Sequence, residues 1–428
     1  MKHLLKQKIK KIICSKSPGF SCPQDKEVSI SIPEITPIEV TFKEDTYKRL
    51  NLVIPSINKV HVFGGISTAI TLFEKLLNIF PEEYYARIII TDAAIESPIN
   101  NFHKYSVSLL GKNNISKRQV VVCNDRYGKK LPIVKSDIFL TTAWWTSHIF
   151  QHVINAQQKH FDTISPLIYL IQDFEPCFYK WSARYALAEA TYKSDIDTIA
   201  IVNSNELSDY LRDNNYVFYK KFYFLPQMNT KLKEFWNTKN TIQKKKQLIV
   251  YGRPSVERNL FPILLEALKL WVWEQPDINE WTILSLGEHH DDIDLGNGAI
   301  LVSKGKLTLE EYATVLLESS LGVSLMLSPH PSYPPLEMAY FGALTITNKY
   351  ANKDLSYMHE NLICVDTCTP ERIAKKLFEA SSKIIENINV GKDGKIYDFS
   401  YIKEENQFPF LNEIYKCINI NDVKYNDA

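Results

Sequence analysis

The chain of 428 residues is long enough to form two or three domains, each with its own hydrophobic core. Hydrophobic residues make up 45% of it and charged residues 23%, which excludes a disordered or collagen-like protein. Glycine is scarce, because the chain has 14 glycines where the average usage of ~7% predicts about 30. We therefore expect the remaining glycines to mark places where a β-carbon would obstruct the backbone or a ligand.

The net charge of +1 hides an uneven distribution of charged residues. Before the first acidic residue, Asp25, the chain contains only basic charges, at Lys2, Lys6, Lys8, Lys10, Lys11 and Lys16. The rest of the chain is mildly acidic and lacks the positive charge with which proteins attract polyanions. Nucleic acid is therefore not an expected partner.

Residues 1–45 form a basic N-terminal arm and extension, in which Leu5, Ile9, Ile12 and Ile13 recur at helical spacing. Lysines on one side and aliphatic residues on the other are typical of a helix that lies on an anionic membrane surface. The alternative is a solvated terminus without a membrane role. There is no cleavable signal and no run of the ~18 apolar residues that a spanning helix needs. We expect a cytoplasmic protein that the arm holds peripherally at the inner face of the cell membrane.

The seven cysteines are scattered, and neither they nor the histidines have the spacing of zinc ligands. This pattern indicates reduced thiols in the cytoplasm. We expect no bound metal and no cofactor.

Residues 46–228 alternate between short apolar runs and amphipathic segments, and we predict an N-terminal α/β domain there. The apolar runs lack the alternation of half-buried strands, which favours a parallel sheet covered by helices on both faces. The expected strands are 52–57, 86–91, 119–123, 137–142, 167–171, 198–203 and 222–225, and the expected helices are 67–80, 147–159, 181–193 and 205–213.

Residues 229–247 are polar and rich in lysine, and we interpret them as a linker. The alternation resumes in residues 248–390, the predicted C-terminal domain. Thr308 with Glu311 predicts a capping box, and Thr369 before Pro370 predicts a second helix start. The expected strands are 248–251, 282–286, 300–303, 322–327, 344–347 and 362–365, and the expected helices are 259–273, 309–318, 335–341 and 371–386.

The pattern as a whole predicts an α/β fold with two doubly wound, Rossmann-like domains that face each other across a cleft. Residues 391–428 are expected to form a tail that packs back on the first domain. In doubly wound sheets ligands bind outside the carboxyl ends of the strands. A ligand shared by both domains therefore belongs in the cleft, where the loops after the strands meet.

Several of these loops contain residues suited to a phosphorylated ligand. Gly64 and Gly65 follow the first strand and precede a helix, although a purely structural turn has the same sequence. Arg253 and Arg258 follow the strand that ends at Gly252, and two guanidinium groups suit a diphosphate, whereas most arginine pairs are merely solvated.

Two later loops add further candidates. Gly305 and Lys306 follow another strand, where backbone groups can bind a planar base. Glu337 is expected in the first turn of the helix over 335–341, either as a ribose ligand or as a residue that stabilises the helix dipole.

These motifs, in this order, resemble the retaining glycosyltransferases of family 4, which have the GT-B fold. Within that family the chain is similar to the rhamnosyltransferases related to WsaF. The likeness covers residues 50–366 and rests on IQDFEPCFY (171–179), ALAEATY (186–192), VYGRPSVERN (250–259), LGNGAILVSKGKLTLEEYA (295–313), SLMLSPHPSYPPLEMAYFGALTITN (324–348) and NKDLS (352–356).

The resemblance implies transfer of L-rhamnose from dTDP-β-L-rhamnose, with retention, to a hydroxyl of a growing bacterial surface glycan, free or lipid-linked. It implies that residues 46–228 form the acceptor-side domain and residues 248–390 the nucleotide-sugar-binding domain. It also implies a reaction without a bound metal, in which protein cations neutralise the diphosphate. The residues to which it gives donor-binding roles are Gly64 and Gly65 at the donor or acceptor, Arg253 and Arg258 at the diphosphate, Gly305 and Lys306 at the base and phosphate, Ser332 and Tyr333 beside the phosphates, and Glu337 at the deoxyribose.

One position departs from the family pattern. Members of family 4 usually carry a second glutamate eight residues before the one that matches Glu337, and this chain has Pro329 there. The carboxylate that commonly binds the hydroxyls of the donor sugar is therefore missing, which is compatible with a deoxysugar donor.

Residues for the acceptor are expected at the end of the strand over 167–171. Asp173 and Glu175 could orient or deprotonate the acceptor hydroxyl, or bind the sugar ring. We count Asp173 with Arg253 and Arg258 as catalytic candidates. Trp144 could stack on a glycan, although a tryptophan is more commonly a core residue.

Two other functions are compatible with the sequence. The protein could be a catalytically silent GT-B protein that binds nucleotide or glycan as an assembly factor, which Pro329 and the basic arm would suit. An epimerase acting on a nucleotide sugar would need a pocket rich in carboxylates, for which the sequence offers no set of residues.

We predict that the full chain binds vesicles containing anionic lipid and that removal of residues 1–16 abolishes this binding. Each lysine near an anionic surface contributes about 1 kcal/mol, so the six lysines together give measurable affinity. Co-sedimentation with anionic and neutral vesicles measures the effect. Binding that persists after the truncation would contradict the assignment.

Overall fold

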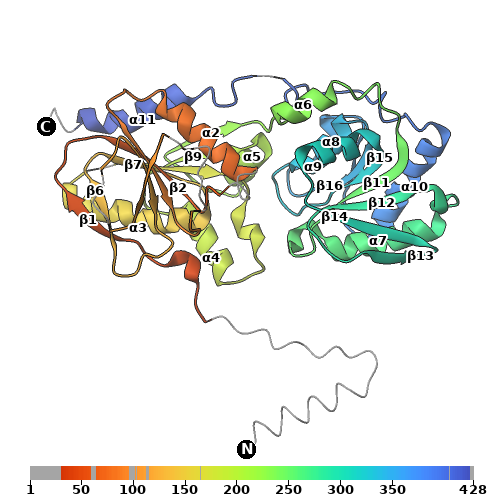
Figure 1. The fold of residues 1–428 in the computed structure, drawn as a ribbon, viewed down its shortest axis with the longest axis horizontal. Helices are drawn as coiled ribbons and strands as arrows, with labels where there is room; N and C mark the ends of the chain where they lie inside the picture. Colours follow the sequence, from red (N-terminus) through yellow and green to blue (C-terminus); the bar gives the residue numbers. More distant parts are fainter. Residues whose placement is uncertain are drawn as a thin grey trace, which may run out of the picture. The chain divides into compact units, whose positions relative to one another are not determined.

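The computed structural model describes residues 30–58, 64–95, 102, 104–111, 115–163, 165–403 and 405–424. The lysine-rich arm lies outside these residues. The chain divides into two units, residues 1–36 and residues 37–428. The described part of the first unit contains a short 3-10 helix, Pro33–Ile35. Both α/β domains belong to the second unit (Figure 1).

The N-terminal domain is built on a parallel sheet of eight strands, β10-β9-β8-β7-β2-β3-β5-β4 in spatial order. Every residue of the central strands β2, β7, β8 and β9 is buried, because helices cover both faces of the sheet. The strands are β2 (Arg49–Ile54), β3 (Tyr85–Ile90), β4 (Ser106–Leu109), β5 (Arg118–Val122), β7 (Asp137–Thr141), β8 (Leu167–Ile171), β9 (Thr198–Asn203) and β10 (Lys220–Phe224).

Two helices from distant parts of the sequence cover one face of this sheet. They are α2 (Gly65–Leu77) and α11 (Leu411–Lys424), which lie side by side in Figure 1. Phe73 of α2 and Ile414 of α11 share a core with Leu52 and Leu170 of the sheet. The C-terminal segment is thus a structural part of the N-terminal domain.

The opposite face is covered by α3 (Trp144–Phe161) and by a separate two-stranded parallel sheet, β1 (Glu39–Lys43) with β6 (Lys130–Val134). Phe150 of α3 and Leu131 of β6 contribute to the core on this side. Two further helices, α4 (Ala183–Ala190) and α5 (Asn205–Asp213), follow β8 and precede β10 respectively.

The C-terminal domain contains a seven-stranded sheet in the order β13-β14-β12-β11-β15-β16-β17. Only the edge strand β13 is antiparallel to its neighbour. Without β13 the order of the strands is 3-2-1-4-5-6, which is that of the Rossmann fold. The strands are β11 (Lys245–Gly252), β12 (Thr282–Gly287), β13 (Ile293–Gly296), β14 (Ala299–Gly305), β15 (Ser319–Val323), β16 (Leu344–Asn348) and β17 (Leu362–Val365).

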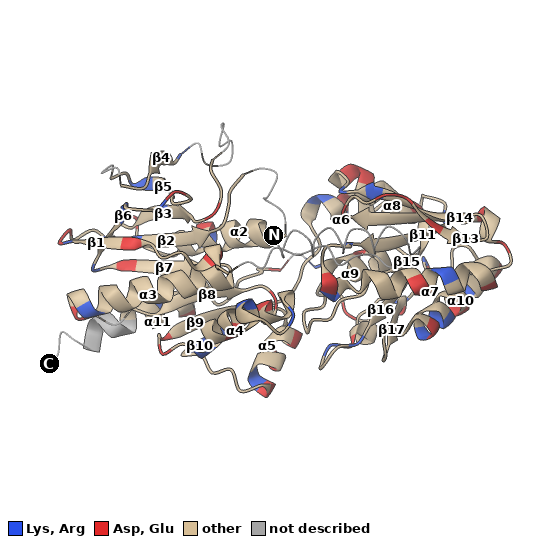
Figure 2. Ribbon diagram, turned by 90° about the horizontal axis from the view of Figure 1, so that it is seen from below, with Lys and Arg blue, Asp and Glu red and all other residues tan. Residues whose placement is uncertain are grey.

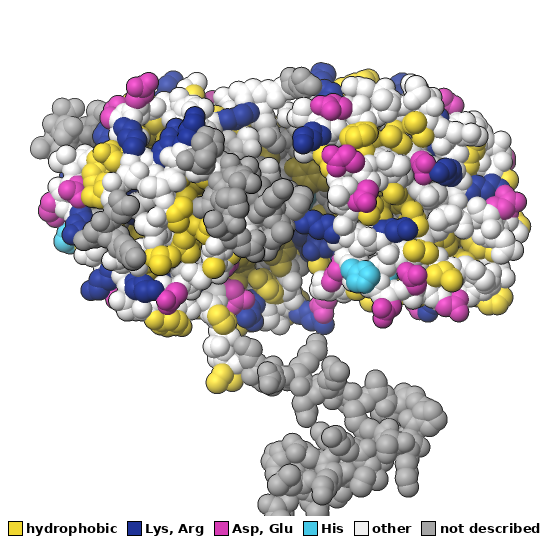
Figure 3. Space-filling view, viewed as in Figure 1, with side chains coloured by type: hydrophobic (Ala, Val, Ile, Leu, Met, Phe, Trp, Pro, Cys, Tyr) yellow, Lys and Arg dark blue, Asp and Glu magenta, His cyan; other side chains and the backbone are white. Residues whose placement is uncertain are grey.

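Helices α7 (Phe261–Glu274) and α10 (Pro370–Glu386) cover one face of the second sheet, and α6 (Thr230–Trp236), α8 (Leu309–Glu318) and α9 (Tyr333–Tyr340) cover the other. Figure 2 shows charged residues mainly on the helices and loops and few on the central strands. On the face shown in Figure 3 basic and acidic side chains are interspersed. Among the described helices, none combines the length and apolar character that a membrane span needs.

The segment interpreted as a linker contains a helix that the sequence analysis did not predict. The Asn229 side chain accepts hydrogen bonds from the backbone N–H groups of Lys231 and Leu232 and so begins α6. Leu232 is 1% exposed within the core of the C-terminal domain. Phe235 and Trp236 pack against the same core, so the three apolar residues have the i, i+3, i+4 spacing of a helix face. The helix was missed because it has only seven residues within a stretch that is otherwise polar and rich in lysine.

The predicted capping box of Thr308 with Glu311 is confirmed, as is the start of α10 at Thr369 and Pro370. The start of α9 differs from the prediction, because the helix begins at Tyr333 with both prolines inside its first turn. Proline is tolerated there, since the first N–H groups of a helix have no partner within the helix.

We predict that Phe408→Ala destabilises the N-terminal domain by about 3–5 kcal/mol, the usual cost of deleting a buried aromatic side chain. Phe408 is 0% exposed and packs against Phe224 of β10. Phe399→Ala is the matched control, because Phe399 is 50% exposed. Urea unfolding followed by circular dichroism measures both variants. Equal midpoints for the two would show that the C-terminal segment does not stabilise this domain.

Candidate functional site

The loops after β8 and β11 meet through an ion pair that joins the two domains. Asp173 follows β8 by two residues, and Arg258 lies in the 3-10 helix Glu257–Asn259 after β11. Arg258 Nη1 donates to Asp173 Oδ2, and the guanidinium also lies over the ring of Phe178, 4.4 Å from its centroid. Arg258 and Asp173 were both predicted as site residues, and the structure brings them into direct contact.

Asp173 accepts two further hydrogen bonds through Oδ1, from the Ser328 hydroxyl and from the backbone N–H of Phe174. Burial alone would raise the pKa of this carboxyl, but the Arg258 charge and the hydrogen bonds outweigh it and lower the pKa. Asp173 is therefore ionised at neutral pH and is a weak base.

His330 lies in the loop between β15 and α9, close enough to Asp173 to influence its charge. It is 5% exposed, and burial lowers its pKa to about 4, so the ring is neutral. Nδ1 accepts a hydrogen bond from the backbone N–H of Ser332 at 3.0 Å, which places the remaining proton on Nε2. Among the described residues this buried Nε2 has no hydrogen-bond partner. A buried donor without a partner indicates a position where a ligand oxygen can bind.

Lys353 adds a buried cation to the same region. It is 1% exposed, and Nζ donates to the backbone oxygen of Met326 at 2.8 Å. Burial lowers its pKa to about 8, while the charge of Asp173 favours the protonated form. Asp173, Arg258, Ser328, His330 and Lys353 are called the junction cluster below.

Other side chains also connect the carboxyl edges of the two sheets. Asn203, the last residue of β9, donates to the Tyr333 hydroxyl at 3.5 Å. Glu206 of α5 accepts from the Tyr357 hydroxyl through its carboxylate and from the side chain of Asn352 through its backbone oxygen. The first of these contacts reaches the N-terminal end of α9, and the other two join α5 to the segment after β16.

Ser332 and Tyr333 form the start of α9. Ser332 has a positive φ of 69°, which a residue with a side chain rarely adopts. The strain orients its N–H toward His330. The ring of Tyr333 packs against that of His330, with the centroids 5.8 Å apart.

Glu337 was expected in the first turn of its helix but lies in the second, because α9 begins at Tyr333. The helix dipole therefore has little influence on it. Its carboxylate accepts a hydrogen bond from the buried Tyr312 hydroxyl at 2.6 Å. Burial raises the pKa of Glu337 to about 7. The partly exposed carboxyl can thus act as a hydrogen-bond acceptor or donor near neutral pH.

Arg253, Gly305 and Lys306 lie at the carboxyl ends of β11 and β14, on either side of β12. Gly287 ends β12 with φ 118°, and a β-carbon there would lie 3.2 Å from Cγ of Arg253. Within the described ranges, the Arg253 guanidinium forms no hydrogen bond or ion pair, although its charge helps to lower the pKa of Glu288. Arg253 is partly exposed and Lys306 is exposed.

Gly64 and Gly65 begin α2 beside the loop that contains Asp173. The Gln172 side chain donates to the backbone oxygen of Gly65 at 2.9 Å, and a β-carbon on Gly65 would lie 2.6 Å from its Oε1. A side chain at position 65 would therefore force Gln172 to move away from this contact. The turn holds the loop after β8 in position.

Glu175 and Trp144 lie behind this surface. Glu175 is 3% exposed and accepts hydrogen bonds from the backbone N–H of Trp144 and from the Tyr169 hydroxyl. Burial raises its pKa to about 8. Trp144 is 0% exposed, with its indole N–H bonded to Tyr179. Its ring is a core element here, so it offers no open face for a glycan.

The described residues contain no group of three or more His, Cys, Asp and Glu side chains arranged to hold a metal ion. The positive charges in the site come from Arg253, Arg258, Lys306 and Lys353.

Comparison with protein families assigns the chain. A model of the WsaF N-terminal domain matches residues 49–205, and a model of the WsaF C-terminal domain matches residues 246–378. Together they match well over half of the chain. The chain belongs to the WsaF family. Its two matched segments correspond to the two α/β domains described above.

One curated relative of this WsaF-family chain is the O-antigen biosynthesis protein RfbC of Myxococcus xanthus. The two sequences are 28% identical over 247 residues, which is 58% of this chain and 18% of RfbC. The chain thus spans less than a fifth of the length of that relative.

Solved structures similar to this chain have the GT-B fold. A sucrose-phosphate synthase from Thermosynechococcus elongatus gives a TM-score of 0.56 at 12% identity, covering 87% of this chain and 100% of its own. A trehalose 6-phosphate synthase from Burkholderia multivorans gives 0.52 at 8%, covering 89% and 99%. WaaG, a glycosyltransferase involved in lipopolysaccharide biosynthesis, gives 0.51 at 10%, covering 86% and 99%. The predicted GT-B fold is confirmed.

Sequence reasoning missed three members of the junction cluster, namely Ser328, His330 and Lys353. All three lie within the motifs that carry the family resemblance, and this was the available signal. Their roles depend on contact with Asp173, which is 155 residues before Ser328.

We predict that Glu175→Gln stabilises the protein more strongly at pH 8 than at pH 5, when the variant is compared with the wild type at the same pH. The pKa of Glu175 is raised to about 8 in the folded protein, compared with 4.5 in the unfolded chain. Ionisation of this carboxyl therefore destabilises the folded protein progressively as the pH rises above the unfolded-state pKa. At about 1.4 kcal/mol per pKa unit, the difference in unfolding free energy between variant and wild type should grow by on the order of 3 kcal/mol between these pH values. Denaturant unfolding at pH 5 and pH 8 measures this. A constant difference would contradict a raised pKa at Glu175.

Proposed function

We propose that this protein transfers L-rhamnose from dTDP-β-L-rhamnose, with retention of configuration, to a hydroxyl of a growing bacterial surface glycan. Membership of the WsaF family and the similarity to an O-antigen biosynthesis protein support a role in glycan assembly. The observation that carries the proposal is the location of Arg253 and the junction cluster at the carboxyl edges of two Rossmann-like sheets, with Glu337 on the adjoining helix α9. A nucleotide sugar needs this combination of cations for its diphosphate and acceptors for its hydroxyls.

The donor would bind mainly to the C-terminal domain. Arg253 has no competing ion pair among the described residues and would bind the diphosphate together with Arg258. Its charge would stabilise the negative charge that grows on the leaving phosphate. Lys306 and the backbone of Gly305 would line the base and phosphate pocket, and Glu337 would accept from the deoxyribose hydroxyl. The unpartnered Nε2–H of His330 would donate to a phosphate or sugar oxygen.

Asp173 would take the place of the carboxylate that this family usually carries at the position of Pro329. Its Oδ1 accepts a hydrogen bond from Ser328, the residue next to Pro329, so a carboxylate of the N-terminal domain lies close to Pro329. Because Asp173 is ionised and a weak base, we assign it to stabilising positive charge on the sugar and orienting the acceptor. The leaving phosphate would take the proton of the acceptor hydroxyl, so the protein would not need a base stronger than Asp173.

Glu175 would act on the acceptor side through the loop it supports. Its carboxyl fixes the N-terminus of α3 and the 3-10 helix Glu175–Phe178 beside Arg258. We propose that it positions Asp173 and that Trp144 supports this loop from the core. The reaction would need no bound metal, and the lysine-rich arm would place it at the membrane surface.

A transfer assay with radiolabelled dTDP-rhamnose and an acceptor glycan tests the proposal. We expect rhamnosyl transfer, or slow donor hydrolysis when the acceptor is absent, both unaffected by EDTA. Arg253→Ala should lower kcat/KM by on the order of 10², as expected when a charge-stabilising donor is lost. A thermal-shift screen of dTDP, UDP, GDP and ADP identifies the base, because a ligand raises the midpoint in proportion to its affinity.

Arg212→Ala is the matched control, since Arg212 is an exposed arginine that pairs with Asp209 and Asp213 on α5. It should leave the rate unchanged. If dTDP binds but neither transfer nor hydrolysis occurs, the alternative of a catalytically silent assembly factor replaces the proposal.

A further inference from the structure

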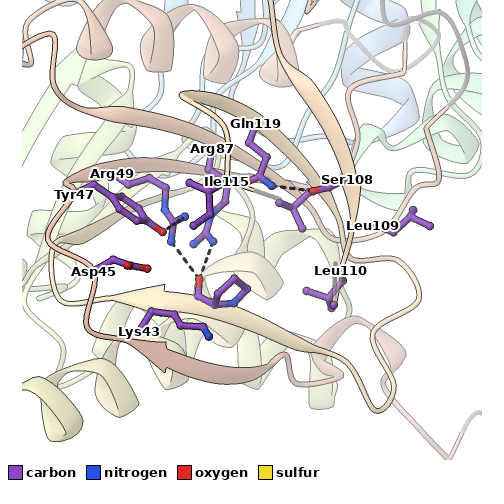
Figure 4. Close-up of a pocket in the computed structure, with 13 residues that line it drawn as sticks. Lys43, Asp45, Tyr47, Arg49, Arg87, Ser108, Leu109, Leu110, Ile115 and Gln119 are labelled. Carbon is purple, nitrogen blue, oxygen red and sulfur yellow. Dashed lines mark hydrogen bonds between the residues drawn. The ribbon is translucent and has the colours of Figure 1, made fainter. Parts of the chain in front are cut away.

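A cavity lies in the N-terminal domain, between the edge of the large sheet and the small β1–β6 sheet (Figure 4). Its volume of about 410 Å³ is within the range of small-molecule sites. The wall includes the ends of β1 and β4 and the amino-terminal parts of β2 and β3. Its polar and apolar lining residues include Lys43, Tyr47, Arg49, Arg87, Leu109 and Leu110.

The positive charges at this cavity outnumber the negative ones. Arg49 is 4% exposed and forms a bidentate ion pair with Asp137, with Nε–Oδ1 and Nη2–Oδ2 distances of 2.6 Å and 2.7 Å. Asp137 also accepts from Asn51 and from the backbone N–H of Val134, each at 2.9 Å. The carboxylate is thus saturated with donors before Arg87 is considered.

Arg87 is the buried cation that remains. It is 1% exposed, and its other donors bind Asn51 Oδ1 at 2.6 Å and the backbone oxygen of Pro132 at 2.8 Å. Nη2 lies 3.6 Å from Asp137 Oδ2 and has no hydrogen-bond partner among the described residues. Burial and the neighbouring Arg49 lower the pKa of Arg87 to about 9, so it stays charged at neutral pH. A buried charge of this kind is costly unless an anion compensates it.

The surrounding groups favour an anion in this space. Figure 4 shows the ends of Arg49 and Arg87 converging from one side, with Lys43 on the other. In the described part of the chain Lys43 Nζ forms no hydrogen bond or ion pair, and the Tyr47 hydroxyl is bonded to Arg49 at 3.3 Å. Asp45 is the one acidic residue in the lining given for this cavity. Three cations therefore face one lining carboxylate and the saturated Asp137.

The cavity is separate from the candidate donor site. Arg49 and Asp137 are the first residues of β2 and β7, whereas Asp173 and Arg253 follow the carboxyl ends of β8 and β11. Residues at opposite ends of parallel strands cannot hold the same small ligand. None of the roles proposed for rhamnosyl transfer uses Arg87 or Lys43.

We propose that this cavity is a binding site for a small organic oxyanion, a carboxylate or a phosphate monoester. Arg87 and Lys43 bind the anionic group, since a guanidinium offers the planar donor pair that fits either oxyanion. The cavity is too large for a bare phosphate, and Leu109 and Leu110 provide apolar surface for the body of the ligand. The site goes beyond the transfer reaction and does not depend on it.

Isothermal titration of the full chain with inorganic phosphate and, separately, with acetate at constant ionic strength tests the proposal. We expect saturable binding of at least one of them, and the one that binds identifies the anionic group. Arg87→Met should weaken that binding at least about tenfold, because a charge-assisted hydrogen bond to a buried group is lost. Lys43→Gln should weaken it about threefold, as an exposed cation contributes less.

Two controls keep the outcome decisive. Lys43→Gln changes an exposed side chain and retains the fold, so it tests the site even if Arg87→Met does not fold. Arg253→Ala removes a cation at the donor site and should leave binding unchanged. The proposal is overturned if neither anion binds, or if binding is lost in Arg253→Ala and unchanged in Lys43→Gln.

Discussion

The parallel arrangement of both sheets determines where chemistry can occur in this molecule. Parallel strands all end at the same edge of a sheet, so every loop that follows a strand lies along that edge of the domain. Asn203 and Gly305 end strands, and Asp173, Arg253 and the loop before α9 follow strands in this way. Residues far apart in sequence therefore come within hydrogen-bonding distance, and the junction cluster forms where the edges of the two domains touch.

Two carboxyl groups in the loop after β8 show how the partners of a residue determine its protonation. Asp173 and Glu175 are two residues apart and both are buried. Asp173 faces the Arg258 cation and has a lowered pKa, whereas the donors to Glu175 are neutral and its pKa is raised to about 8. At neutral pH Asp173 is therefore an anion that accepts hydrogen bonds, whereas Glu175 is mainly protonated and uncharged.

The sequence was sufficient to predict the buried strands, most helices and the loops that contain the site. These features depend on local composition: apolar runs for β7 to β9, and the Thr308 and Thr369 caps. It was not sufficient for β1, β4, β6 and β13, which are short or partly exposed and lack a long apolar run. The Asp173 contacts with Arg258 and Ser328 could not be predicted, because the partners lie 85 and 155 residues away in the other domain. The Arg87 cavity was missed for the same reason, since charged residues within strands give no signal of how they pair.

The contact between Asp173 and Arg258 also bears on how tightly an anionic ligand can be held. Any diphosphate that uses Arg258 has to displace or share an internal anion, so binding at this guanidinium is an exchange of one negative partner for another. The apparent dissociation constant then equals the intrinsic one divided by the fraction of molecules in which Arg258 is released. If a nucleotide binds at Arg258, the same competition would favour its release, because Asp173 is close enough to pair with the guanidinium again.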